Sequence, residues 1–128
     1  ITMRYRAQEG ECMLEPDLFK SLMMNLIDNA IKSMDERGGV VSVHIEMLGD
    51  GCKCIIRDTG RGIPQEEITR ITEAFYRVDK SRSRRQGGVG LGLALCHEIV
   101  RLHKGTMEFA SEPDKGTTVT IVLRGGAI

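Results

Sequence analysis

Apolar and polar residues follow one another along the chain with two different periods. Apolar residues recur at helical spacing within 16–35 and 89–103, which predicts two long helices. Elsewhere they alternate with polar residues or run together, which predicts five strands: 1–7, 40–48, 52–58, 105–111 and 117–123. Shorter patterns predict a strand at 11–14 and a helix at 65–72. Because strands and helices do not alternate strictly, we expect an α+β domain, with one mixed or antiparallel sheet covered by helices on one face.

Turn-forming residues separate these segments. Pro16 suits the first turn of a helix, where its missing N–H would have no partner anyway. The pair Gly38-Gly39 would end that helix. Gly49-Asp50-Gly51 and Pro113-Asp114-Lys115-Gly116 each predict the turn of a hairpin.

The first long helix carries a polar stripe. On a wheel at about 100° per residue, six apolar residues share one arc, which we expect to face the core: Phe19, Met23, Ile27, Ala30, Ile31 and Met34. Asn25, Asn29 and Lys32 fall together on the opposite side. Asparagine is a poor helix former, an amide oxygen suits Mg²⁺, and a lysine one turn away suits a phosphate. The stripe is interpreted either as a solvated face or as a ligand site.

Two loops concentrate the glycines. The segment D-T-G-R-G-I-P at 58–64 follows a strand. It is either a tight turn with a capping aspartate, or a wall that a flat ligand can approach, with a carboxylate for an amino group such as that of adenine. The segment G-G-V-G-L-G-L at 87–93 opens a helix, where backbone N–H groups can hold phosphates. It has neither Rossmann nor P-loop spacing, and a hinge is the alternative interpretation.

A basic segment separates the two loops. Five of its nine residues are basic: Arg77, Lys80, Arg82, Arg84 and Arg85. The segment is interpreted either as a solvated loop or as a mobile lid whose charges close over a polyphosphate.

Composition narrows the class of protein. The chain has 128 residues and 14.2 kDa, so one domain is expected over 1–128. Its 18 basic and 18 acidic residues cancel and aromatics are only 4%, which argues against a nucleic-acid binder. The four cysteines lack zinc-site spacing and are expected as reduced cytosolic thiols. No apolar run is long enough for a membrane span, and the start at Ile1 suggests a piece of a longer protein.

Four motifs occur in a fixed order: N-L-I-D-N-A-I-K at 25–32, D-T-G-R-G-I-P at 58–64, E-A-F-Y-R-V-D at 73–79 and G-V-G-L-G-L-A-L at 88–95. The set resembles the catalytic ATP-binding domain of two-component sensor histidine kinases, with its N, G1, F and G2 boxes. Residues 103–123 resemble that family's last hairpin. The resemblance implies a Bergerat-type α/β sandwich, with about three helices on one face of a mixed sheet and a flexible ATP lid.

The resemblance also implies roles for single residues around ATP. Asn29 would hold Mg²⁺, while Asn25 and Lys32 would contact the phosphates. Asp58 would accept the adenine amino group, partly through water that Thr117 or Thr118 supports. The remaining residues would admit the purine (Gly60, Gly62), line the purine or ribose (Ile63, Tyr76), meet the terminal phosphate (Arg77, with Arg84) or wrap the phosphates with backbone (Gly88, Val89, Gly90, Leu91, Gly92). Two departures are Val89, where a threonine is common, and Ser33, where an aromatic residue is common.

Asn25 indicates the type of reaction. Hydrolysing relatives such as gyrase B have a glutamate there that activates water, and an amide cannot accept that proton. The resemblance therefore implies phosphoryl transfer with Asn25, Lys32 and Arg77 as the catalytic set and slow hydrolysis alone. The acceptor histidine would lie in a separate dimerisation domain, since the surroundings of His97 do not match its motif. A response regulator would be an indirect partner, and the domain would be a cytoplasmic part of a membrane-anchored kinase without membrane contact of its own.

Three other readings of the sequence are open. An anti-sigma-factor-type serine kinase shares the fold and would have about this length. A degenerate, non-enzymatic interaction domain would keep the fold but lose the phosphate-facing residues, which are present here. A hydrolysing ATPase of the gyrase type is disfavoured by Asn25.

Overall fold

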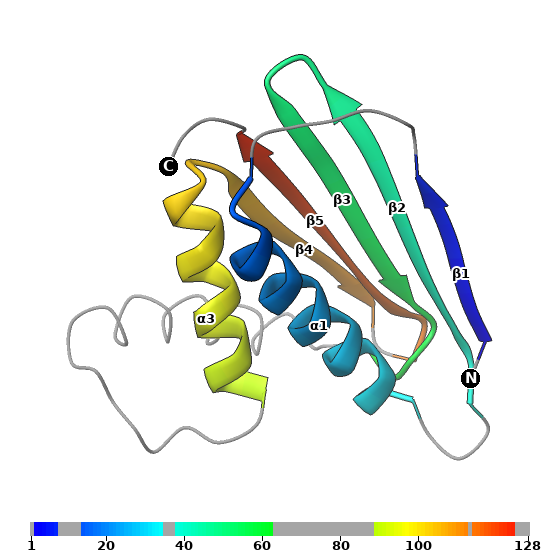
Figure 1. The fold of residues 1–128 in the computed structure, drawn as a ribbon. Coiled ribbons are helices and arrows are strands. Elements are labelled where there is room, and N and C mark those ends of the chain that lie inside the picture. The colour runs from blue at the N-terminus through cyan, green and yellow to red at the C-terminus, as the bar shows by residue number, and fades with distance from the viewer. Residues whose placement is uncertain (1, 8–13, 35–37, 63–88, 113, 125–128) are drawn as a thin grey trace.

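The structure is a computed structural model that describes residues 2–7, 14–34, 38–62, 89–112 and 114–124, with the backbone alone for residues 5 and 89–92 (Figure 1). Its elements match the seven long segments that the sequence predicts to within a few residues. They are β1 (Thr2–Ala7), α1 (Pro16–Lys32), β2 (Val40–Leu48), β3 (Gly51–Asp58), α3 (Val89–Leu102), β4 (Thr106–Glu112) and β5 (Gly116–Arg124). The strand expected at 11–14 lies mostly outside the described residues, and the helix expected at 65–72 lies wholly outside them.

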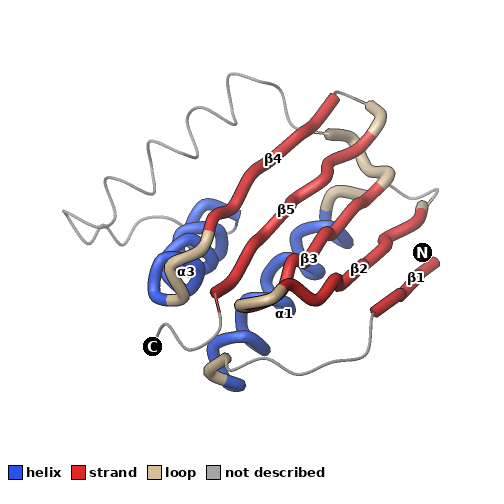
Figure 2. The backbone as a smooth tube through the Cα atoms, turned by 90° about the horizontal axis from the view of Figure 1, so that it is seen from above, coloured by secondary structure: helices blue, strands red, loops and turns tan. Residues whose placement is uncertain are grey.

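The strands form one mixed sheet in the order β1-β2-β3-β5-β4. β1 pairs with β2 in parallel, and the other neighbours are antiparallel. Both described helices lie over the same face of this sheet, as Figures 1 and 2 show from two directions. The expected α+β architecture, a mixed sheet with helices on one face, is confirmed; the structure describes two of the three helices expected.

Helix α1 begins and ends with side-chain caps. The Glu15 carboxylate accepts from the Leu18 N–H at 2.7 Å, and Pro16 takes the first helical position as expected. The helix ends at Lys32, earlier than the predicted 35. The Ser33 N–H bonds to the carbonyls of both Asn29 and Ala30, and its hydroxyl donates to the Ala30 carbonyl at 2.7 Å. These bonds tighten and close the last turn before the glycine pair is reached.

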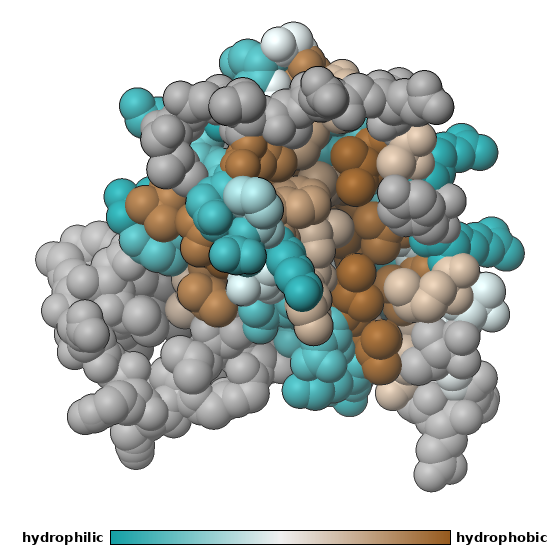
Figure 3. Space-filling view, viewed as in Figure 1, coloured by the Kyte–Doolittle hydropathy of each residue, from teal (hydrophilic) through white to brown (hydrophobic). Residues whose placement is uncertain are grey.

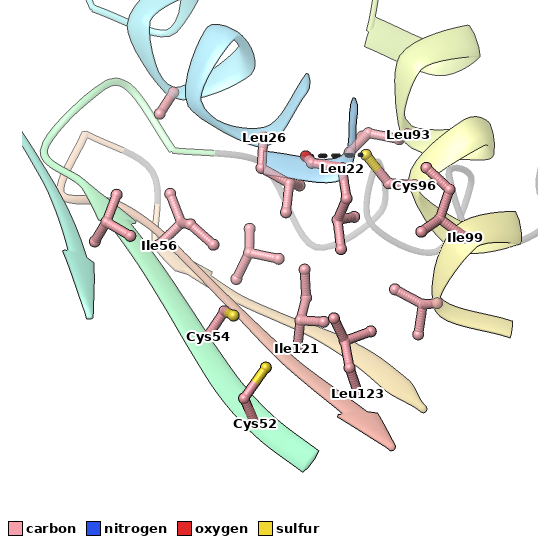
Figure 4. Packing of buried hydrophobic residues seen from close by; sticks show 14 of the residues in the cluster. Leu22, Leu26, Cys52, Cys54, Ile56, Leu93, Cys96, Ile99, Ile121 and Leu123 are labelled. Carbon is pink, nitrogen blue, oxygen red and sulfur yellow. Dashed lines mark hydrogen bonds between the residues drawn. The ribbon is translucent and has the colours of Figure 1, made fainter. Parts of the chain in front are cut away.

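The core face of α1 differs from the predicted arc. Leu22, Leu26 and Ala30 are the buried residues of the helix, whereas Ile31, expected in the core, is 39% exposed. The reason is that α1 packs on the sheet and also on α3, whose Cys96 thiol donates to the Leu22 carbonyl at 3.9 Å (Figure 4). The most buried residues of α1 therefore lie on the side of the helix that faces α3. Phe19, Met23, Ile27 and Met34 pack against the edge of this core.

This rotation changes the meaning of the polar stripe. Asn29 lies only about 20° from Leu22 on the helical wheel, so the stripe borders the core and does not stand opposite it. Asn25 and Asn29 are both half-buried. On the other border of the helix, a strip of apolar surface lies beside α1 on the side toward β2 (Figure 3).

His103 joins the end of α3 to the start of α1. Its ring is fully buried, with Nδ1 2.9 Å from the Ile99 carbonyl and Nε2 accepting from the Glu15 N–H at 3.4 Å. Nδ1 therefore carries the proton and Nε2 is the acceptor. His103 follows the last helical residue directly and closes the C-terminal end of α3 through its bond to the Ile99 carbonyl.

Candidate functional site

A pocket of about 210 Å³ lies between the C-terminal half of α1 and the sheet. It opens where β3 ends and β5 begins, so that distant parts of the sequence meet there. Its walls come from α1, the end of β3 and its following loop, α3, β4 and β5. The lining residues are Leu26, Asn29, Ala30, Lys32, Ser33, Ile56, Asp58, Arg61, Gly62, Leu93, Phe109, Thr117 and Val119.

Five residues predicted from sequence line this one pocket: Asn29, Lys32, Asp58, Gly62 and Thr117. They come from three segments that are far apart in the chain. The parts of the pocket differ in chemistry, because the α1 side brings an amide and an ammonium group while the strand ends bring a carboxylate and a hydroxyl. Apolar side chains complete the walls between them.

Two predicted residues lie beside the pocket without lining it. The Asn25 side chain is half-buried, and its Nδ2 donates to the Ser21 carbonyl at 2.8 Å. Gly60 is buried, and its N–H donates to Asp58 Oδ1. The other predicted residues are Ile63, Tyr76, Arg77, Arg84 and Gly88, which lie outside the described residues, and Val89, Gly90, Leu91 and Gly92, of which only the backbone at the start of α3 is described.

Asp58 lies buried at the end of β3, with 7% of its surface exposed. Its Oδ1 accepts from the Gly60 N–H at 2.8 Å, a turn that fixes the carboxylate relative to the loop. The other oxygen, Oδ2, has no hydrogen-bond partner among the described residues. One oxygen therefore holds the loop, and the second is available to a donor in the pocket.

The sequence does not decide between Thr117 and Thr118. The structure places the two side chains differently. Thr117 is opposite Asp58 in the β3–β5 register, is 6% exposed and lines the pocket. Its hydroxyl is 3.0 Å from the Ser111 hydroxyl. Thr118 points to the other face of the sheet, where its hydroxyl accepts from Arg57 Nε at 3.3 Å. Thr117 is therefore the threonine whose hydroxyl lies next to the Asp58 carboxylate.

Asn29 is the polar side chain of the pocket that lacks a partner. Its Nδ2 is buried without a hydrogen bond to any described residue. Leaving such a donor unpaired costs about 1–3 kcal/mol, so a ligand that offers this N–H group an acceptor, such as a phosphate oxygen, would be favoured. Lys32 has an exposed partner instead, because its Nζ lies 3.0 Å from Asp28 Oδ2 with both side chains more than half exposed. Such a pair contributes little and can exchange for an anion in the pocket.

The loop after β3 is fixed to its surroundings at several points. The Arg61 N–H donates to the Ser33 carbonyl at 3.2 Å, and the Arg61 carbonyl accepts from the Asp114 N–H at 2.6 Å. Gly62 has a φ of 74°, in the left-handed region that favours glycine. The loop is therefore held between the end of α1 and the β4–β5 turn.

Sequence reasoning missed several lining residues. Phe109 lies on the core side of β4 with Met107 and Ser111, and the alternation along that strand was the signal that could have placed it. Arg61 lies within the glycine motif at 58–64, which predicts no role for its side chain. Ser33 was singled out only for replacing an aromatic residue. The apolar walls of the pocket are buried residues of the core cluster: Leu26, Ile56, Leu93 and Val119.

Three further features of the described residues are their metal-ligand groups, their helices and their cysteines. Among the described residues, no three His, Cys, Asp or Glu side chains gather as a metal site. None of the described helices is long and apolar enough to cross a membrane. The three described cysteines are buried, and no disulfide joins them within the described residues.

Residues 14–126 match the family of histidine kinase-, DNA gyrase B- and HSP90-like ATPases. The chain belongs to this family. It is 42% identical over 113 residues to the signal transduction histidine-protein kinase ArlS of Staphylococcus aureus, an alignment that covers 88% of this chain and 25% of the relative. The chain thus spans about a quarter of the length of the curated relatives that it matches.

Solved structures agree with this membership. The mycobacterial sensor histidine kinase MprB superposes with a TM-score of 0.73 at 28% identity, over 97% of this chain and 81% of that one. The catalytic domain of histidine kinase ThkA gives 0.74 at 18% identity, over 97% and 78%, and therefore shows the fold alone. The family resemblance read from the four motifs, and the α/β sandwich that it implied, are confirmed.

Proposed function

We propose that this chain is the ATP-binding catalytic domain of a sensor histidine kinase. It binds Mg-ATP in the pocket beside α1 and supplies the γ-phosphoryl group to a histidine on a separate dimerisation domain. The observation that carries this proposal is the convergence of Asn29, Lys32, Asp58, Gly62 and Thr117 on one pocket in a member of an ATPase family whose matched relatives are named as histidine kinases.

The strand end of the pocket suits adenine. The base is flat, and its exocyclic amine is a donor that Asp58 Oδ2 can accept while Oδ1 remains bonded to Gly60. Thr117 would support a water between this carboxylate and the ring, and the apolar walls would cover the ring faces. The pocket is smaller than the roughly 300–1,000 Å³ typical of drug-sized ligands. At about 210 Å³ the described walls thus enclose part of a nucleotide, such as the base.

The α1 end of the pocket suits the phosphates and Mg²⁺. The residues present fit this ion, because Asn29 lines the pocket and brings a neutral amide oxygen that could ligate it. The buried, unpaired Nδ2 of the same amide is a donor and would pair with a phosphate oxygen. Bound there, Mg²⁺ would neutralise the charge that develops on the phosphoryl oxygens. Lys32 would exchange Asp28 for a phosphate, and Asn25 would turn from the Ser21 carbonyl toward it. Arg77, Arg84, Ile63, Tyr76 and the backbone of 88–92 would complete the site.

Asn25 sets the limit on hydrolysis by this domain. Its amide is a donor to the Ser21 carbonyl and has no basic site that could take a proton from water. Transfer of the γ-phosphoryl group would therefore require a positioned nucleophile, which the dimerisation domain would supply. A response regulator would receive the group later, and the whole kinase would be anchored in a membrane with this domain in the cytoplasm. No described residue and none of the relatives above favours the serine-kinase alternative.

Isothermal titration with a nonhydrolysable ATP analogue tests the nucleotide site. We expect micromolar binding with Mg²⁺ and clearly weaker binding with excess chelator. Asn29→Asp should weaken the Mg²⁺-dependent binding, because a carboxylate adds charge next to the polyphosphate. Asp50→Asn, in the exposed β2–β3 turn, is the matched control and should not change it. Absence of binding heat under all these conditions would contradict the proposal.

A transfer assay tests the kinase part separately. The chain is mixed with radiolabelled Mg-ATP and with the histidine-bearing dimerisation domain of a matched relative such as ArlS. We expect label on that domain, sensitive to acid as a phosphohistidine is, and little free phosphate when the chain is incubated alone. Rapid release of phosphate by the chain alone would contradict the role given to Asn25.

A further inference from the structure

The sheet face turned away from α1 and α3 carries a second hollow, of about 610 Å³. Because side chains alternate along a strand, this face collects every second residue of β1, β2 and β3. The hollow is lined by Arg4, Arg6, Ser42, Val43, His44, Ile55 and Arg57, none of which lines the pocket beside α1. This surface, called the basic hollow below, carries three arginines, Arg4, Arg6 and Arg57.

Strand register places its arginines in two adjacent rows. In one row, Arg4 is opposite Ser42, which is opposite Arg57. In the next, Arg6 is opposite His44, which is opposite Ile55. Strands lie about 4.8 Å apart and alternate residues about 7 Å apart, so the three arginine backbones form a triangle about 7–10 Å on its short sides. Ser42 and Ile55 also line the hollow.

These charges are not neutralised within the described residues. Arg4, Arg6 and Arg57 are all exposed, and Arg4 and Arg6 have no ion pair there. Arg57 donates to a neutral hydroxyl, that of Thr118. Glu46, two residues after His44 on β2, pairs with His44 at 3.2 Å. Glu108 on β4 is separated from His44 by Ile55 and Thr120 in the strand register. Three like charges on one face repel one another, and an anionic partner removes that repulsion.

We propose that the basic hollow docks an acidic segment of a partner protein. Carboxylates at alternate positions of an extended segment repeat about every 7 Å, which matches the spacing of Arg4 and Arg6 along β1. Arginine pairs with carboxylates through two parallel hydrogen bonds. This geometry favours a carboxylate-bearing segment over free counterions as the occupant of the hollow. The hollow is shallow and its arginines are exposed, unlike a site that encloses a small molecule. The neutral chain with 4% aromatics argues against a nucleic acid.

Fluorescence anisotropy on the full chain tests this docking. The probe is a short labelled peptide of alternating glutamate and serine, measured at low ionic strength, and its glutamine counterpart is the control. The double variant R4Q/R6Q should bind about tenfold more weakly, and binding should weaken further as salt screens the pairs. K20Q/K115Q removes the same charge from exposed lysines on α1 and the β4–β5 turn, and should change affinity less than about twofold.

The outcomes separate this proposal from its alternatives. If the edge-strand double variant does not fold, as seen by its thermal melt, R57Q on the central strand β3 replaces it and should also weaken binding. Equal loss in K20Q/K115Q, or equal binding of the glutamine peptide, would overturn the proposal. So would displacement of the peptide by pyrophosphate or by phosphatidylserine vesicles at lower concentration than by unlabelled peptide. No variant touches the pocket beside α1, so nucleotide titration of the same proteins tests the proposed function independently.

Discussion

Gly60 packs directly against Ser33, the residue that ends α1. A Cβ at Gly60 would lie 2.7 Å from the Ser33 carbonyl oxygen and would also collide with the Ser33 hydroxyl. That same carbonyl accepts from the Arg61 N–H at 3.2 Å. The loop after β3 and the end of α1 therefore form one unit, and both contribute to the pocket.

Gly60→Ala should therefore destabilise the domain and weaken nucleotide binding together. Overpacking of this kind costs about 1–3 kcal/mol, because the backbone of Ser33 cannot move away without releasing Arg61. Chemical denaturation and titration with the ATP analogue measure the two effects. Gly49→Ala is the matched control, since a Cβ there meets nothing within 4 Å, and it should change the unfolding free energy by less than about 0.5 kcal/mol. An alanine at 60 with native stability would contradict the close approach.

Asn29→Leu should separate stability from binding. The change removes a buried amide with an unpaired Nδ2, so the unfolding free energy should stay level or rise by about 1 kcal/mol. Mg²⁺-dependent nucleotide binding should be lost, because leucine offers no ligand. Asn25→Leu is the comparison, since its Nδ2 is bonded to Ser21 and its loss should not stabilise. A large loss of stability in Asn29→Leu would show that the amide is structural.

The sequence predicted the elements well because each is coded locally. Alternation along 40–58 and 105–123, and the turns at Gly49-Asp50-Gly51 and 113–116, are enough to place two strand pairings, β2 with β3 and β4 with β5. The observed core face of α1 differs from the predicted one because it depends on the packing of α3, which no local pattern contains. The motif predicts Asp58 as a site residue but does not distinguish Thr117 from Thr118, and the β3–β5 register places Thr117 opposite Asp58. Arg61 and Ser33 were missed as lining residues, since their place depends on how the loop meets the end of α1.

His103→Leu should lower the unfolding free energy by about 1–3 kcal/mol. Both ring nitrogens are engaged, and a leucine would leave the Glu15 N–H without its partner at the start of α1. Thermal melts and hydrogen exchange at the first turn of α1 measure the effect. His44→Gln, which changes a partly exposed His–Glu contact on β2, should cost less than about 0.5 kcal/mol. Equal effects of the two substitutions would refute the bridging role.

The buried thiol of Cys96 should make the domain less stable at alkaline pH. Burial between α3 and α1 raises the pKa of its thiol from 9.0 to about 12. Above pH 9 the unfolded chain loses this proton while the folded chain keeps it, so stability falls by up to roughly 1.4 kcal/mol per pH unit between pH 9 and 12. Urea unfolding at rising pH measures this slope. It should be smaller in Cys96→Val, and the same slope in both proteins would contradict the assignment.

The most direct test of the nucleotide site compares adenine and guanine analogues on Asp58. Isothermal titration should show micromolar binding of the Mg²⁺ complex of the adenine analogue, with the guanine analogue at least about tenfold weaker, because guanine has no exocyclic amine at the corresponding ring position for Asp58 Oδ2. Asp58→Asn keeps the Oδ1 bond to Gly60 but places an amide donor against the base. We predict that this variant remains folded and loses at least about tenfold in adenine affinity. Unchanged affinity and base preference in Asp58→Asn would contradict the account.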